Sequence, residues 1–173
     1  WGRGVSSPPA QGPVKKEGDL RSPAGIFELG GVYGTVPVPN KKRSMPYRRI
    51  TPRDMWVDEP SSPLYNQHFV LKHDPVTPWE FKQQMKLNDY AHSLKLFIRH
   101  NATGDQGRPV AGGGSSIFFH IWRRDGQAPT AGCTAMSEEN LRAMIAWLDP
   151  SKHPLYILLP SREYLRLRKA WGL

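Results

Sequence analysis

The sequence is poor in cysteine: Cys133 is the only one in 173 residues. A chain with one cysteine forms no internal disulfide, which excludes the disulfide-stapled scaffolds of many small secreted proteins. No apolar run is long enough to cross a bilayer. Only 38% of the residues are hydrophobic. We therefore expect a single domain over residues 1–173 with one small core, and a monomer.

Several binding signatures are also missing. The glycines at 112–114 lack the Lys-Ser/Thr ending of a phosphate-binding loop. The histidines show no metal-ligand spacing, and no nucleic-acid-binding module is present. We expect no metal, no cofactor and no nucleic-acid partner. The net charge of +9 favours an anionic partner, although scattered surface charge is an equally good explanation.

Seventeen prolines and sixteen glycines favour turns and short strands over long helices. We expect a mainly β, α+β fold, with residues 1–13 a loop or edge strand and residues 22–25 a turn. Strands are predicted at 26–29, 94–99, 116–122 and 155–159, the last of them buried. Helices are predicted after the capping box at Thr77 and after Ser137, and a basic C-terminal helix at 161–173.

Cys133 and His120 form the candidate chemical site. His120 ends an apolar strand, and Cys133 follows thirteen positions later, behind the small residues Ala131 and Gly132. A cysteine that folding brings beside a histidine is a candidate nucleophile with its base. The backbone N–H groups of Ala131, Gly132 and Cys133 are candidate donors to an oxyanion.

The same pair has simpler explanations. Free cysteine is among the most buried residue types, and a lone histidine is often a hydrogen-bonded core residue. A catalytic Cys133 needs a thiolate, and we expect an imidazolium at His120 or the N-terminus of the helix capped by Ser137 to lower its pKa. The stretch 55–66 also has two interpretations, because Trp56 can line a site or pack in the core.

The motifs of this sequence resemble those of the L,D-transpeptidase (YkuD-like) family. His120 followed by Thr130-Ala131-Gly132-Cys133 resembles the catalytic signature, a histidine and then Ser/Thr-x-Gly-Cys. Residues 16–27 resemble the upstream element Lys-x-Glu-Gly-Asp-x-x-Thr-Pro-x-Gly. Asp58-Glu59-Pro60 with Tyr65-Asn66 resembles a loop of a divergent exported branch. The likeness covers residues 14–160. This chain differs at Ala131, where the family usually has histidine, and at Thr134 and Ala135, where Arg or Asn is usual.

The resemblance implies a β-sandwich with a few short helices that acts on peptidoglycan stem peptides. It implies that Cys133 forms a thioester with a stem peptide and that His120 serves as general base and acid. It further implies substrate contacts from a set of residues around the site: Trp56, Asp58, Tyr65, Asn66, Arg123, Thr130 and Thr134. Stem carboxylates would give Arg48, Arg49, Arg123 and Arg124 a role.

Two rival functions stay open at this stage. Water in place of the acceptor amine gives an L,D-carboxypeptidase or endopeptidase, and an inert Cys133 gives a non-catalytic cell-wall-binding module. The chain opens at Trp1 without a signal segment. We interpret it as an exported product of the periplasm or cell envelope.

Overall fold

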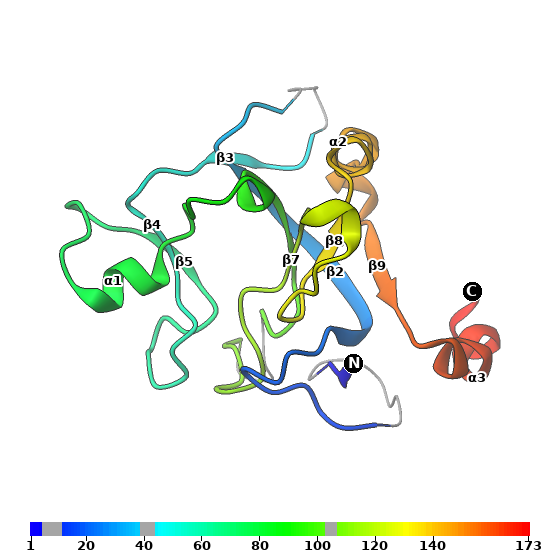
Figure 1. Cartoon of the computed structure of the whole chain (residues 1–173). Coiled ribbons are helices and arrows are strands. Elements are labelled where there is room, and N and C mark those ends of the chain that lie inside the picture. The colour runs from blue at the N-terminus through cyan, green and yellow to red at the C-terminus, as the bar shows by residue number, and fades with distance from the viewer. Residues whose placement is uncertain (5–11, 39–43, 103–106) are drawn as a thin grey trace.

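The computed structural model describes residues 1–4, 12–38, 44–102 and 107–173. These residues form a seven-stranded sheet, a two-stranded sheet and three short α-helices, so the expectation of a mainly β, α+β fold is confirmed (Figure 1). The five strands in path order are β1 (Gly2–Arg3), β2 (Pro23–Gly34), β6 (Leu94–Ile98), β7 (Phe118–Ile121) and β8 (Thr134–Met136). No described helix is long and apolar enough to cross a membrane.

The long strand β2 joins two halves of the larger sheet. Its first half pairs with β1 and with β9 (Leu155–Leu158), and its second half pairs with β3 (Tyr47–Arg49) and β6. The register shifts between Leu29 and Val32, where the strand bends. The turn predicted at 22–25 is wrong, because β2 begins at Pro23. Pairing with β1 and β9 overrides the local turn preference of Ser-Pro-Ala-Gly.

The strands β6 and β7 are buried on both faces, and this determines where the site lies. Leu96 and Phe119 point into the main core, which α2 (Glu138–Trp147) covers. Phe97 and Phe118 point to the opposite face, where they meet Trp56. The predicted alternation of these strands is therefore confirmed. The opposite face also carries the two-stranded sheet of β4 (Asp54–Trp56) and β5 (His68–Val70).

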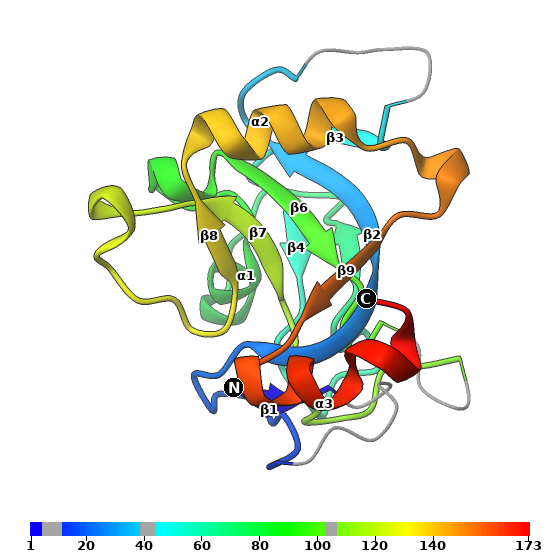
Figure 2. The same cartoon turned by 90° about the vertical axis from the view of Figure 1, so that its right-hand side faces the viewer.

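The helices begin where the capping residues predict. α1 (Pro78–Gln83) starts with a reciprocal capping box between Thr77 and Glu80, and Ser137 caps α2. α3 (Ser161–Trp171) ends at Gly172 in a left-handed conformation. In Figure 2, α2 lies across the upper end of the sheet and α3 at its lower end.

Two expectations concern the first residues of the chain and its last strand. Residues 2–3 do form a short edge strand, whereas residues 5–11 lie outside the described part of the chain. β9 is not buried as predicted: Leu155 is exposed and the rest of the strand is half-buried. The reason is its position, since β9 pairs with β2 alone among the described strands.

Candidate active site

The sulfur of Cys133 lies beside the start of β7. β7 and β8 run parallel with Phe119 opposite Thr134, so Cys133 stands next to Phe118. The backbone N–H of Phe118 donates to Cys133 Sγ at 3.4 Å, and the thiol donates to the carbonyl oxygen of Ser116 at 3.4 Å. The first of these bonds favours a thiolate and the second favours a thiol. Both fix the direction of the side chain.

The loop before Cys133 is closed by Thr130. Its hydroxyl donates to the carbonyl oxygen of Cys133 at 2.7 Å and accepts from the N–H of Gly132 at 3.3 Å. Gly132 has a φ of +132°, and a Cβ there would lie 2.7 Å from the carbonyl oxygen of Arg21. Only glycine fits this position without displacing the loop. The N–H of Gly132 is directed at Thr130 in this arrangement, and the side chain of Ala131 is exposed.

His120 reaches the same side of the sheet as Cys133. Alternation along β7 places His120 on the face of Phe118, and Cys133 packs against the hydrophobic cluster on that face. Its Nδ1 lies 2.7 Å from the carbonyl oxygen of Ile121. A carbonyl only accepts, so Nδ1 carries the hydrogen and Nε2 of the neutral ring is the free base. Ile121 is the orienting group that the sequence could not name.

The pKa values differ from the sequence-based expectation. Burial raises the pKa of the Cys133 thiol, although the Phe118 N–H and the charge of Lys95 act against this. Burial also lowers the pKa of His120, against the bond to Ile121. The expected lowering of the thiol pKa by an imidazolium is therefore wrong for the free protein. In the free protein at neutral pH, Cys133 is therefore a thiol and His120 an uncharged ring.

A second histidine lies against the first. The rings of His92 and His120 stack with centroids 4.8 Å apart and planes inclined by 24°. Asp89 and Arg123 both approach Nδ1 of His92, at 3.2 and 3.3 Å. Burial lowers the pKa of His92 to about 4, so this ring is neutral at pH 7. No sequence pattern indicated a role for His92, because this residue lies in a short 3₁₀ turn, η1 (Tyr90–His92).

Cys133 and His120 open into one cleft with a volume of about 170 Å³. Residues from β4, the end of α1, the following loop, β6 and β7 line it: Trp56, Asp58, Lys82, Gln83, Gln84, Met85, Leu87, His92, Lys95, Ser116, Phe118, His120 and Cys133. The position of Lys95, by contrast, follows from a pattern in the sequence. The alternation that turns Leu94 and Leu96 to the core leaves Lys95 on the face of His120.

The substrate contacts implied by the resemblance are distributed unevenly. Trp56 and Asp58 line the cleft. Trp56 also packs on Phe97 with the ring centroids 4.4 Å apart, so both interpretations of Trp56 apply. The other five lie outside the set of described residues that line it: Tyr65, Asn66, Arg123, Thr130 and Thr134. Thr134 bonds to Tyr156 at 3.0 Å, and Arg123 to Asp89 at 2.8 Å.

Of the four arginines assigned to stem carboxylates, two bind carboxylates of this chain. Arg48 is paired with Asp54, which is fully buried. Arg123 is paired with Asp89, and the pairing holds the pKa of that carboxyl, against burial, at about 2. Arg49 and Arg124 are exposed.

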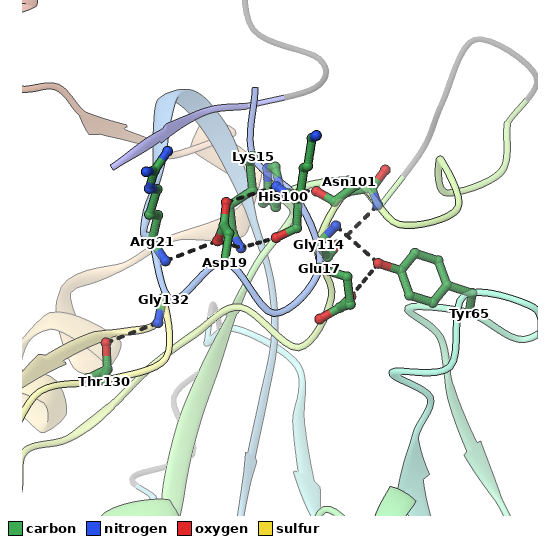
Figure 3. A network of polar contacts seen from close by, with 12 residues as sticks. Lys15, Glu17, Asp19, Arg21, Tyr65, His100, Asn101, Gly114, Thr130 and Gly132 are labelled. Carbon is green, nitrogen blue, oxygen red and sulfur yellow. Dashed lines mark hydrogen bonds and ion pairs between the residues drawn. The ribbon is translucent and has the colours of Figure 1, made fainter. Parts of the chain in front are cut away.

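Behind the loop that carries Cys133 lies a polar network that includes the upstream element (Figure 3). Tyr65 donates to the Glu17 carboxylate and accepts from the N–H of Gly114 at 3.0 Å. Asp19 binds the ammonium of Lys15 and the backbone N–H of Arg21. The carbonyl of Arg21 is the atom against which Gly132 packs. The residues of the upstream motif thus support the cysteine loop from outside the cleft.

Asn66 connects this network to the cleft. Its Oδ1 accepts from the indole N–H of Trp56 at 2.9 Å and from the N–H of Ser116 at 3.1 Å. Its Nδ2 donates to the carbonyls of His100 and Asn101. The carbonyl of Ser116 in turn accepts the thiol of Cys133. Asn66 therefore positions Ser116 and Trp56 and has no hydrogen-bonding capacity left for a substrate.

Within the described ranges, no three His, Cys, Asp or Glu residues are arranged to hold a metal ion. A family model described as the L,D-transpeptidase catalytic domain (YkuD) matches residues 2–157. The match spans most of the sequence, and the chain belongs to the L,D-transpeptidase family. No curated protein and no solved structure matches it. Members of this family are cysteine-dependent enzymes of the cell envelope that act on peptidoglycan stem peptides.

Proposed function

We propose that this chain is a peptidoglycan L,D-transpeptidase that joins stem peptides through a thioester on Cys133. The observation that carries the proposal is the convergence of Cys133 and His120, thirteen residues apart, on one face of the sheet and in one cleft. Membership of the family supplies the substrate class. We place the working site in the periplasm or cell envelope, with residues 1–173 as one catalytic domain and a monomer as the active unit.

The first half-reaction follows from the protonation states. Nε2 of neutral His120 takes the proton of Cys133, and the thiolate attacks a stem-peptide carbonyl at an L-centre. The oxyanion is received by the backbone N–H groups of Ala131 and Cys133, because the N–H of Gly132 is bonded to Thr130. The tetrahedral intermediate collapses as His120 returns the proton to the departing amine, which leaves a thioester on Cys133.

The second half-reaction uses the same groups in reverse. The amine of a second stem peptide attacks the thioester, and His120 accepts its proton. Collapse expels the Cys133 thiolate, which regains the proton, and a new peptide bond joins the two stems. Ile121 keeps Nδ1 protonated throughout, so Nε2 performs both transfers.

Incubation of the protein with purified muropeptides, followed by mass spectrometry, tests the proposal. Cross-linked dimers support transfer, and Cys133→Ala must abolish them. Trimmed monomers in place of dimers would establish an L,D-carboxypeptidase or endopeptidase. Unchanged muropeptides, together with a thiol that alkylates as slowly as a buried structural cysteine, would leave the non-catalytic binding module. A carbapenem adduct on Cys133, detected by mass, would independently identify the nucleophile.

A further inference from the structure

A lysine is buried in the cleft next to the reacting pair. Lys95 on β6 is the cross-strand partner of His120, so the two side chains point to the same face. Lys95 is only 4% exposed, and its Nζ lies 5.5 Å from the centre of the Phe118 ring. Phe118 is the residue whose N–H binds Cys133 Sγ. The ammonium therefore shares the wall of the cleft with the nucleophile.

In the part of the chain that the structure describes, this ammonium has no carboxylate partner. Its one hydrogen bond goes to the carbonyl oxygen of Met85 at 2.7 Å. Asp58, the acid among the described residues that line the cleft, is engaged by Gln83 at 2.9 Å and by Lys82 at 3.3 Å. Burial of a cation without an anion costs free energy, and burial lowers the pKa of Lys95 to about 8. Lys95 is still mainly protonated at pH 7.

The other charges around Cys133 are compensated. Lys15 behind the loop is paired with Asp19, and Arg123 beyond β7 is paired with Asp89. The two titratable rings on the cleft face, His92 and His120, have pKa values lowered by burial and are neutral at pH 7. Lys95 is therefore the uncompensated positive charge facing the sulfur among the described residues.

We propose that Lys95 is the counter-charge of the Cys133 thiolate. When His120 removes the thiol proton, the negative charge on sulfur forms in a cleft whose walls include the Lys95 ammonium, and the two charges attract. The proton on Lys95 does not move, and no bond to it forms or breaks. Lys95 is thus a positioning residue that acts through charge. The proposal rests on the proposed function only in taking Cys133 as the nucleophile.

The test is the pH dependence of Cys133 alkylation by iodoacetamide, which needs no peptidoglycan. In Lys95→Met, we expect alkylation at pH 7, where Lys95 of the wild type is protonated, to slow about tenfold, and the difference to shrink as the pH rises above the pKa of Lys95, about 8. Lys95→Arg keeps the charge and should restore most of the rate. Lys82→Met is the matched control, because Lys82 lines the same cleft but is exposed and paired with Asp58. We expect its alkylation rate at pH 7 to match the wild type.

An unchanged alkylation rate at pH 7 in folded Lys95→Met would overturn the proposal, and so would an equal loss in Lys82→Met. If Lys95→Met does not fold, the wild-type protein gives the answer through the reciprocal effect. NMR of ¹³C-labelled lysine should show part of Lys95 still in the ammonium form at the high pH where the thiolate forms, and this part should vanish after Cys133 is carbamidomethylated. An identical titration before and after alkylation contradicts the proposal.

The two proposals fail separately. Slower alkylation of Lys95→Met at pH 7 together with unchanged muropeptides would leave the charge pairing intact and remove the transpeptidase activity. Conversely, cross-linking by Lys95→Met at the wild-type rate and pH profile would support the transpeptidase activity and remove the charge pairing.

Discussion

Two asparagines behind the cysteine loop and two titratable groups of the cleft differ in how fully they are hydrogen-bonded. Behind the loop, Asn66 and Asn101 each use both the oxygen and the nitrogen of the amide in hydrogen bonds to the chain. In the cleft, the described contacts of Lys95 and His120 include one hydrogen bond each. A fully bonded group holds its neighbours in place, whereas a buried group with spare capacity is available for chemistry. Gly132 lies at the boundary between the two regions.

The largest effect is expected in the cleft, from His120→Gln. Removal of the general base should lower the rate of dimer formation from muropeptides about 10²–10⁴-fold, while the free energy of unfolding changes little by comparison. In the wild type, the rate should fall as the pH drops through the pKa of His120, which burial places below the usual 6.5, because only the neutral ring accepts the thiol proton.

His92→Gln is the matched control for His120→Gln, since His92 stacks on His120 without access to the same orienting carbonyl. We expect a loss of no more than several-fold. Equal losses in the two variants would contradict the assignment of His120 as the base.

At the boundary, Gly132→Ala should damage both regions. The new Cβ would lie 2.7 Å from the Arg21 carbonyl oxygen at a φ of +132°, so the loop must move and Cys133 must move with it. We expect at least a tenfold loss of cross-linking and destabilisation of about 1–3 kcal/mol by urea titration. Gly112→Ala is the control: its φ is +73°, but nothing lies within 4 Å of the added carbon. Cross-linking as fast in Gly132→Ala as in Gly112→Ala would show that the loop tolerates displacement.

The site elements were predictable from the sequence to the extent that they follow local rules. The alternation around His120, the caps at Thr77 and Ser137, and the glycine before Cys133 all follow from local chemistry. The start of β2 at Pro23 does not follow from local chemistry, because its pairing with β1 and β9 involves residues far apart in the chain.

The roles of the motif residues were harder to predict. Tyr65 and Asn66 were assigned to the substrate because they belong to a loop motif, yet their partners Glu17, Gly114 and Ser116 lie about fifty residues away on either side. Such contacts have no periodicity to reveal them. The strand face of Lys95 was predictable, but its importance depends on its having no carboxylate partner among the described residues, which only the fold shows.

In the network behind the loop, Tyr65→Phe should reduce stability more than chemistry. The change removes a half-buried hydrogen bond to the Glu17 carboxylate and a buried one from the Gly114 N–H. We expect a loss of about 2–3 kcal/mol in the free energy of unfolding and a change in cross-linking rate of only a few-fold. Tyr90→Phe removes an exposed hydroxyl that bonds to Glu138, and it should change stability by less than about 0.5 kcal/mol. A tenfold loss of rate in folded Tyr65→Phe would place Tyr65 in the chemistry instead.

The smallest effect comes from a fully bonded group beside the cleft, Asp54 on β4. Arg48, His68 and both polar groups of Thr51 bind its carboxylate and, against burial, lower its pKa from 3.8 to about 2. A lowered pKa stabilises the fold above the unfolded value and is lost as the pH falls through the folded one. Wild-type protein should therefore lose about 2 kcal/mol between pH 5 and pH 2 from this group. Urea titrations of Asp54→Asn should lack that part of the decline. Asp74→Asn, which changes an exposed carboxylate paired with Arg53, is the control and should retain it. If Asp54→Asn declines as steeply as the wild type, hydrogen-bond saturation beside the cleft does not stabilise the fold as it does behind the nucleophile loop.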